Sequence, residues 1–502
     1  MATAEVRVNQ QLIFEKGVEG RHGINLESRD VPRAGDLPRR KPMFFKGVQE
    51  STVVQHYTSL GNRNINMETA EEDIDLGSCT MKYNPKLNDA MAALDSFAWA
   101  HPYQEIETVQ GAMEIMYELH GMLAVVGGMD AVSLTPRSGA HGEFAAGLMI
   151  RACQYDRGQG EQRRIMLVPD SAHGTNPATA AMAGFEVLTI NTKKDGNMDI
   201  DQLAKVLKED GENVAGLMFT QPSTWGYFDP NMPEISEMVH KAGGLVFVDG
   251  ANLNALLGKA ELRAMGADCH QINLHKTFST PHGGGGPGSG PICATAELAP
   301  FLPGPVVRKN EINGLYEFAM PEKSIGRLAA GQGNWGMLIR AYTYILSLGA
   351  DGLREVSESA VVNANHLLVL LMDHYKPAVE GRTTMHEAVF AGLRDKSAKT
   401  QDVVKRLVDK GSYPTVYFPL NVDEAIMAEP TESMTKEGIE HLADSMIEVA
   451  IEAVNNPDIL HTAPHRTPVG RLDEATAARK PVLRWRPEEP KAETQLQPPE
   501  LV

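Results

Sequence analysis

A run of four apolar residues that ends in an acidic residue is the feature that most limits how this sequence folds. Residues 245–248 are β-branched or bulky and lie between Gly244 and Gly250, which is typical of a buried strand in a parallel sheet. Asp249 follows at the carboxyl end of the run. Because open α/β sheets bind ligands beyond the carboxyl ends of their strands, we expect this carboxylate to face a ligand.

A second strand-end residue, Lys276, could converge on the same ligand. Residues 271–274 predict a short strand that leads into this lysine. A lysine can hold the aldehyde of pyridoxal 5′-phosphate (PLP) as a Schiff base, and a carboxylate such as Asp249 can keep the pyridine nitrogen of that cofactor protonated. Spacing alone leaves a surface lysine beside a strand-end aspartate equally open.

The residues around Lys276 favour the cofactor site over a surface lysine. His275 and His282 flank the lysine, and six glycines lie between Gly283 and Gly290. Glycine is needed where the backbone packs closely or turns with a positive φ angle. A surface lysine accounts for neither the histidines nor the glycines.

Further apolar runs alternate with amphipathic segments and predict a mostly parallel sheet with helices on both faces. The expected strands are residues 164–168, 186–190 and 214–219, and the expected helices include 86–98, 104–126, 201–207 and 235–242. Past Pro303 the pattern changes to long helices (335–348 and 353–374), strands (388–393 and 415–420) and shorter helices (400–407 and 436–454), which predict a smaller α+β domain. We therefore expect an arm and active-site loop (1–85), a large α/β domain (86–330), a small domain (331–485) and a disordered tail (486–502).

Two further segments could contact a cofactor. Residues 136–143 form a small-residue turn that feeds a helix, and the free N–H groups of Ser138, Gly139 and Ala140 could bind a phosphate there; a simple serine N-cap is the alternative. His173 follows the strand predicted at 164–168, where it could contact a bound ring, although an isolated histidine is usually structural.

Several motifs together resemble one enzyme family. The segment His275-Lys276-Thr277-Phe278 and the glycine-rich residues 281–288 resemble the PLP-lysine motif of glycine decarboxylase, the P-protein of the glycine cleavage system. Residues 76–85, 101–104 and 170–174 also match, and the resemblance extends from Leu12 to Arg484. The chain is most similar to the lysine-bearing second subunit of the two-subunit form.

This resemblance implies a fold, a cofactor site and a reaction. The fold is that of type I PLP enzymes, in which Lys276 binds PLP, Asp249 pairs with the pyridine nitrogen and His173 stacks on the ring. The resemblance also implies that Ala251 packs on the other ring face, that Ser138, Gly139 and Ala140 bind the phosphate, and that His275 lies near it. The implied reaction decarboxylates glycine and transfers the aminomethyl group to the lipoyl group of the H-protein.

The resemblance further implies a partner. The single-chain form of the family joins two related halves, and this chain corresponds to the half that carries the lysine. We expect a lysine-lacking subunit 1, with two copies of each subunit, and we expect residues 76–85 and the Asn334 loop near the boundary. A homodimer active alone is the alternative.

Three segments depart from the family pattern. Gln221 replaces an asparagine, residues 331–334 read Gly-Gln-Gly-Asn where Phe-Tyr-Gly-Asn is common, and residues 411–415 lack a histidine and are one residue short. A substrate role for that histidine cannot be carried over to this chain.

Composition excludes several classes of function. The 502 residues have a formal net charge of −18, which argues against nucleic-acid binding, and no apolar run approaches the roughly 20 residues of a membrane span. The four cysteines lack CxxC spacing, which indicates free thiols in a reducing, cytoplasmic compartment. The first forty residues resemble neither a secretory signal nor a transit peptide, and we expect an extended arm.

Other functions explain fewer residues. Gly283, Gly285 and Gly288 fit a dinucleotide-binding pattern, but no clear helix follows and no ribose-binding acid is well placed. A metal site made of Cys269 and the histidines at 270, 275 and 282 would leave Asp249 and Lys276 unexplained, so we expect no metal. A catalytically silent subunit and another PLP enzyme of the same fold, such as a decarboxylase or desulfurase, remain as alternatives.

Overall fold

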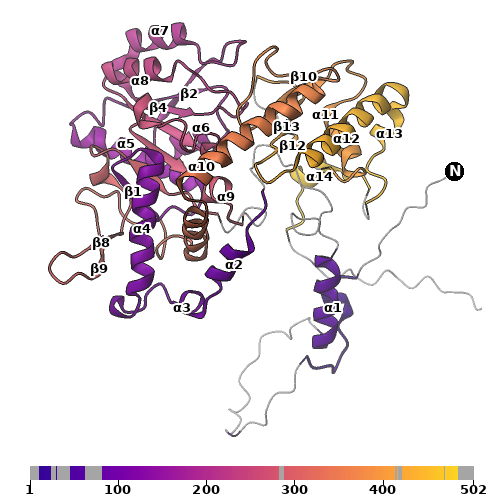
Figure 1. Ribbon diagram of the computed structural model, residues 1–502, viewed down its shortest axis with the longest axis horizontal. Helices are drawn as coiled ribbons and strands as arrows, with labels where there is room; N and C mark the ends of the chain where they lie inside the picture. The colour runs from indigo at the N-terminus through magenta and orange to yellow at the C-terminus, as the bar shows by residue number, and fades with distance from the viewer. Residues whose placement is uncertain are drawn as a thin grey trace, which may run out of the picture.

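The computed structural model describes residues 11–23, 30, 46–62, 82–281, 288–412, 415–416, 421–467 and 470–483. Two separate sheets, joined by the long helix α10, organise the chain (Figure 1). Several predictions lie outside the described residues: the loop at 63–81, His282, the glycines at 283–286, the end of the strand at 415–420, and the tail at 486–502.

The larger sheet has seven strands in the order β1-β7-β6-β5-β4-β2-β3. Their bounds are β1 Ala131–Ser133, β2 Ile165–Pro169, β3 Glu186–Ile190, β4 Val214–Thr220, β5 Leu245–Gly250, β6 Cys269–Ile272 and β7 Ile292–Ala294. The neighbours from β3 through β2, β4 and β5 to β6 pair in parallel, whereas β7 is antiparallel to both β6 and β1. The predicted mostly parallel sheet is confirmed.

Successive side chains of the central strands point to opposite faces of the large sheet and pack in two separate hydrophobic cores. Val246 and Val248 of β5 pack with α4 (Gln110–Gly127), α7 (Ile200–Asp210) and α8 (Met232–Lys241). Leu245 and Phe247 of the same strand pack on the other face with α5 (Gly139–Asp156) and α6 (Thr175–Met182). A strand buried on both faces needs a continuous apolar run, which is what residues 245–248 supply.

The smaller sheet has four strands in the order β10-β11-β13-β12, all paired antiparallel. The strands are β10 Tyr375–Pro377, β11 Ala388–Leu393, β12 Thr415–Val416 and β13 Ala425–Ala428, and the helices α11 (Thr400–Val408), α12 (Lys436–Asn455) and α13 (Pro457–His461) accompany them. Apolar residues of α12 such as Leu442 and Met446 pack with Phe390 of β11 in one core. The division of the chain into domains stays a prediction.

Helix α10 (Trp335–Leu371) runs from the large sheet to the small one (Figure 1). Gly349 interrupts it with φ 63°, a conformation that only glycine adopts without cost. The sequence predicts two helices, 335–348 and 353–374, and the structure joins them across this kink. The first half packs on the large domain's core through Leu338 and Tyr344, and the second half packs on the small domain's core through Leu367.

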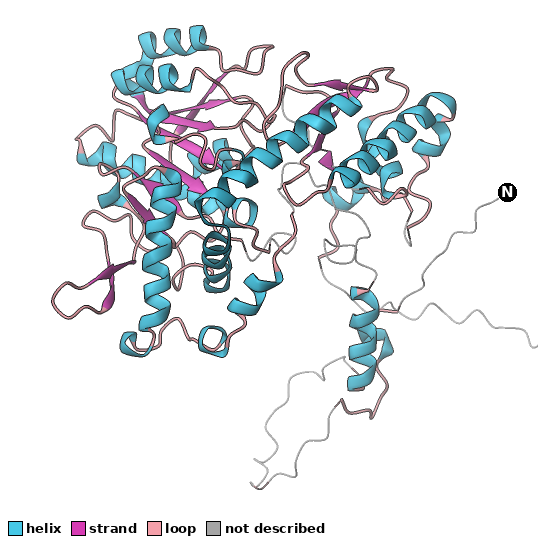
Figure 2. Ribbon diagram, viewed as in Figure 1, coloured by secondary structure: helices cyan, strands magenta, loops and turns pink. Residues whose placement is uncertain are grey.

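Other elements complete the fold (Figure 2). These are α1 (Glu50–Gly61), α2 (Lys86–Ala92), α3 (Asp95–Ala98), α9 (Leu274–Thr277), α14 (Glu474–Arg479) and the hairpin of β8 (Val306–Lys309) and β9 (Tyr316–Ala319). Three expectations are wrong: the segment 1–85, expected to be an arm and a loop, contains the helix α1, the helix expected at 86–98 is two short helices, and the helix expected from residue 104 begins at Gln110. Among the described residues, no helix is long and apolar enough to cross a membrane.

Candidate active site

Asp249 lies at the carboxyl end of β5, where its carboxylate accepts three hydrogen bonds. Its side chain is buried, and the β5–β6 register pairs it with Gln271. The Oδ1 atom accepts from Nε2 of Gln271 at 2.6 Å and from the backbone N–H of Ala251 at 3.0 Å, and Oδ2 accepts from Nδ2 of Asn176 at 3.1 Å. Donors on both oxygens fix the orientation of the carboxylate and stabilise its negative charge.

Glu143 on α5 forms a second buried carboxyl group beside Asp249. Nδ2 of Asn176 also donates to Oε2 of Glu143 at 2.7 Å, and Oδ1 of Asn176 accepts from the hydroxyl of Thr220 at 3.1 Å. Burial, together with the nearby Asp249 carboxylate, raises the pKa of Glu143 to about 8. At neutral pH, therefore, the Glu143 carboxyl group holds a proton.

Lys276 lies on the one-turn helix α9, close to the same carboxyl groups. The strand expected at 271–274 is displaced: β6 ends at Ile272, and the chain turns at Asn273 into α9. The Lys276 side chain is buried, and its positive charge partly opposes the rise in the pKa of Glu143 and adds to the fall in the pKa of His173 that burial causes. Lys276 follows β6 and Asp249 ends the neighbouring strand β5, and their convergence on one ligand stays a prediction.

His173 lies between the end of β2 and the start of α6. Its Nδ1 atom is 2.8 Å from the hydroxyl of Thr175 and accepts a hydrogen bond from the backbone N–H of Thr175 at 3.2 Å. Burial lowers the pKa of this histidine, the Asp249 carboxylate opposes that shift, and the Lys276 ammonium adds to it. The ring is therefore neutral and held in one orientation, as a stacking contact requires.

The first turn of α5 lies against the chain segment that follows the glycine-rich residues. Ser138 caps the helix by accepting from the N–H of His141 at 3.2 Å, and the first N–H groups of any helix lack intrahelical partners. A Cβ on Gly290 would lie 2.0 Å from the carbonyl oxygen of Ser138, and one on Gly288 would lie 2.9 Å from Nδ1 of His275. Glycine is required at both positions, because the 288–290 segment fits between the Ser138 turn and His275.

The residues at this site fit PLP. Asp249 suits a protonated pyridine nitrogen, Lys276 suits an aldehyde, and an 18-residue helix presents its positive end at Gly139 and Ala140 for a phosphate. Within the described part of the chain, four buried polar atoms near α9 have no hydrogen-bond partner: Oε1 of Gln271, Oδ1 of Asn273, Oγ1 of Thr277 and Oγ of Ser289. Such atoms are expected where a polar ligand binds.

Sequence reasoning missed a second group of buried polar residues. His386 and Glu387 precede β11 and Glu429 follows β13, so the β11–β13 pairing brings them together. Their ligand-type atoms lie within 4.8 Å of one another, close enough to share a metal ion. Burial lowers the pKa of His386 to about 3, and the positive charge of Lys276 adds to that shift.

The structure describes the surroundings of two of the three segments that depart from the family pattern. Gln221 exchanges two hydrogen bonds with the backbone of Asp229, donating at 2.8 Å and accepting at 3.1 Å, so it closes its own turn. Asn334 accepts from Arg137 at 3.3 Å and donates to the carbonyl oxygen of Gly288, which places the 331–334 loop beside the Ser138 turn. Residues 413–414 lie outside the described part of the chain.

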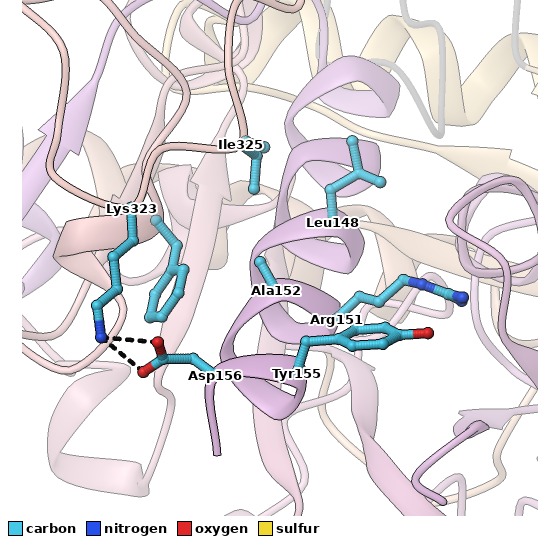
Figure 3. A pocket seen from close by; sticks show the side chains of 8 residues that line it. Leu148, Arg151, Ala152, Tyr155, Asp156, Lys323 and Ile325 are labelled. Atoms are coloured by element: carbon cyan, nitrogen blue, oxygen red, sulfur yellow. Dashed lines mark hydrogen bonds and ion pairs between the residues drawn. The ribbon is translucent and has the colours of Figure 1, made fainter. Parts of the chain in front are cut away.

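A surface pocket of about 490 Å³ lies elsewhere on α5 and is shown in Figure 3. Leu148, Ala152 and Tyr155 line it, and Lys323 closes one side by binding the carboxylate of Asp156 at 2.7 Å. None of the predicted site residues lines this pocket. It lies toward the carboxyl end of α5, whereas the amino end of α5 belongs to the candidate site.

Two family models and several solved structures are similar to this chain. The family model described as "Aminotransferase class-V" matches residues 142–286. The model described as "Glycine dehydrogenase, C-terminal domain" matches residues 356–465. Among solved structures, a glycine decarboxylase (P-protein) of the glycine cleavage system superposes with a TM-score of 0.67 at 22% identity, covering 84% of this chain and 92% of that one. Glutamate decarboxylase from Lactobacillus brevis gives 0.61 at 15% identity, covering 83% and 96%.

Fold and site together define a PLP-dependent enzyme of the aminotransferase class-V fold. Probable glycine dehydrogenase (decarboxylating) subunit 2 from Caldanaerobacter subterraneus subsp. tengcongensis is 50% identical over 94% of this chain and 98% of its own length. The protein of the same description from Lysinibacillus sphaericus is 48% identical over 95% and 99%. The chain belongs to the glycine dehydrogenase (decarboxylating) subunit 2 family.

Proposed function

We propose that this chain uses PLP to decarboxylate glycine and transfers the aminomethyl group to the lipoyl group of an H-protein, with release of CO2. The observation that carries the proposal is 50% identity, over nearly the full length of both chains, to a probable glycine dehydrogenase (decarboxylating) subunit 2. The site supports it, because a hydrogen-bonded aspartate ends β5 and a buried lysine follows the neighbouring strand β6.

Each site residue has a defined task in this proposal. PLP, when bound, supplies the sink for the electron pair that remains after CO2 leaves glycine. Lys276 would hold the cofactor aldehyde and could exchange a proton at Nζ, and Asp249 would pair with the pyridine nitrogen. His173 covers one face of the ring and Ala251 the other. Ser138, Gly139 and Ala140 would bind the cofactor phosphate, and His275 would lie near it.

The transfer balances without an external oxidant. The bond from the glycine α-carbon to its carboxylate breaks and CO2 leaves, and the α-carbon then bonds to one sulfur of the lipoyl disulfide. The second sulfur leaves with the electron pair of the S–S bond and takes up one proton. Glycine carbon is oxidised to CO2, and the disulfide is reduced.

A second, related subunit without the lysine is part of the proposal, in a complex with two copies of each. The names of the relatives support it, since they describe a subunit 2. We further propose a cytoplasmic location, which the three buried free cysteines of the described chain (Cys153, Cys269 and Cys293) support.

The test is exchange of labelled bicarbonate into the carboxyl group of glycine, measured with the reconstituted complex and lipoylated carrier. Label should enter glycine only when the carrier is present. A reconstituted protein that binds PLP and acts on other amino acids, but shows no glycine exchange, would identify another PLP enzyme of this fold.

A further inference from the structure

Lys82 is a buried lysine outside the set of residues that contact the proposed cofactor. It lies four residues before α2, and its side chain is almost wholly inaccessible to solvent. Its Nζ atom donates to three acceptors: the carbonyl oxygen of Thr277 at 3.2 Å, the hydroxyl of Tyr344 at 3.3 Å and Oε1 of Glu432 at 2.6 Å. The three donors of one ammonium are therefore all used within the protein.

These acceptors come from three separate parts of the fold. Thr277 is the last residue of α9 and follows Lys276 directly, Tyr344 belongs to α10, and Glu432 lies just before α12 of the small domain. The hydroxyl of Tyr344 also donates to Oε1 of Glu432 at 2.9 Å. One ammonium group thus connects the lysine helix, the interdomain helix and the small domain.

The residue that follows Lys82 strengthens the same connection. Ser279 donates through its hydroxyl to the carbonyl oxygen of Tyr83 at 2.5 Å, and the N–H of Tyr83 donates to Oγ of Ser433 at 3.2 Å. Residues 82–83 therefore lie between the segment that leaves α9 and the segment 432–433, with hydrogen bonds to both.

The charge of Lys82 is retained in this buried position. Burial lowers the pKa of a lysine, but here Glu432 and Tyr344 outweigh burial and raise the pKa of Lys82 above its ordinary value. Burial raises the pKa of Tyr344 to about 12, so its phenol stays protonated and can donate to Glu432. The cluster is an ammonium, a carboxylate and a neutral hydroxyl.

A one-turn helix needs such support. α9 has four residues, too few to be stable alone, and the carbonyl group of its last residue, Thr277, has no following helical N–H to pair with. Lys82 supplies a charged donor to that carbonyl, and a cation at a helix carboxyl end is also favourable for the helix dipole. The residue whose backbone is fixed in this way adjoins Lys276.

We propose that Lys82 is a positioning residue for Lys276: its contact with the Thr277 carbonyl fixes α9 and thereby the backbone that carries the cofactor lysine. The inference depends on Lys276 being the cofactor lysine and is independent of which amino acid is the substrate. An ion pair that serves only stability is the competing explanation.

Three variants separate positioning from stability. Lys82→Met removes the charge and the Thr277 contact at similar length and leaves Glu432 buried without its partner. Glu432→Gln removes the ion pair but leaves the ammonium on the Thr277 carbonyl. The double variant removes both charges, and this should recover the stability lost by an unpaired buried carboxylate. Tyr344→Phe, which keeps the ion pair and the Thr277 contact, is the matched control.

The first readout uses the cofactor-free chain. Backbone amide exchange of residues 274–279 should rise about tenfold in Lys82→Met and in the double variant, with little change in Glu432→Gln and Tyr344→Phe. The second readout is the visible circular dichroism of bound PLP, which should weaken in the same two variants. In the reconstituted complex, kcat should fall about 100-fold in these two variants, with little change in KM.

The proposal is overturned if the double variant regains wild-type exchange, dichroism and turnover, because charge pairing would then be the whole role of Lys82. Wild-type behaviour of Lys82→Met overturns it as well. If Lys82→Met does not fold, Glu432→Gln and the double variant still decide: equal loosening of residues 274–279 in both contradicts the Thr277 contact. Absence of glycine exchange in the wild-type complex would reject the proposed function and leave these readouts interpretable.

Discussion

The carboxyl groups of Glu143 and Asp249 accept hydrogen bonds from the same amide nitrogen, Nδ2 of Asn176, at 2.7 and 3.1 Å. Two buried carboxylates this close would repel each other, and the protein resolves the conflict by leaving the proton on Glu143, whose pKa is raised by burial and by Asp249. Glu143 therefore adds no negative charge beside Asp249, the residue proposed to pair with the pyridine nitrogen.

Glu143→Gln should change the pH dependence of stability in the cofactor-free chain. The folded-state pKa of Glu143 is about 8, above its ordinary value of 4.5, so between these values the folded state holds a proton that the unfolded state has released. This one group lowers the free energy of unfolding by about 1.4 kcal/mol per pH unit as pH rises. Urea denaturation from about pH 5 to about pH 8 should show the variant gaining stability relative to wild type.

The control for that experiment is Glu209→Gln, because Glu209 is exposed on α7. It should shift neither the slope nor the relative stability. A Glu143→Gln curve parallel to the wild-type curve would mean that Glu143 is ionised in the fold and that the pair carries two charges.

Lys276→Ala should abolish covalent attachment of the cofactor, since Nζ is the only proposed point of attachment. The measurement is the intact mass after incubation with PLP, borohydride reduction and removal of excess cofactor. Wild type should gain one reduced cofactor, and Lys205→Ala, at an exposed site on α7, should gain the same mass. One bound cofactor in Lys276→Ala would show that the lysine is misassigned.

His173 gives a test that separates ring stacking from proton transfer. The imidazole is held by Thr175, and its lowered pKa keeps it neutral. His173→Ala should weaken PLP binding about tenfold, the order expected for loss of one aromatic contact, whereas His173→Phe should retain most of the affinity. Fluorescence titration with PLP measures both. Equal losses in the two variants would assign His173 a polar role.

The sequence predicts the parts of this molecule that depend on local pattern. The apolar run before Asp249 identifies a central strand, because a strand covered on both faces has no polar alternation. The strand before Lys276 is predicted two residues late, since His270 is polar although it is buried within β6. Local pattern could not show that the polar side chain of Gln271 is satisfied by Asp249 on the next strand.

Contacts between residues far apart in the sequence could not be predicted from local pattern. Glu143 and Asn176 are 33 residues apart, and Lys82 and Glu432 are 350 residues apart. Neither pair has a periodic signal, and each looks like an ordinary helix or loop residue in the sequence. Two features of the sequence point to these residues. Asn176 lies three residues after His173. Lys82 lies within the motif at 76–85 that resembles the family, although the resemblance does not specify the contacts of Lys82.

The last prediction concerns the second subunit. If the active site is completed by a related, lysine-lacking chain, the isolated chain should bind PLP and show little glycine exchange, because loops near the Ser138 turn would lack their partner. We expect the 331–334 loop to be one of these loops, since Asn334 contacts both Arg137 and Gly288 at that turn. Light scattering of the chain alone and co-expressed with its candidate partner should show a shift to a complex with two copies of each, accompanied by a gain in exchange. Full exchange activity from the isolated chain would reject the heteromeric proposal and retain the cofactor site, because Asp249, Lys276 and the amino end of α5 all belong to one chain.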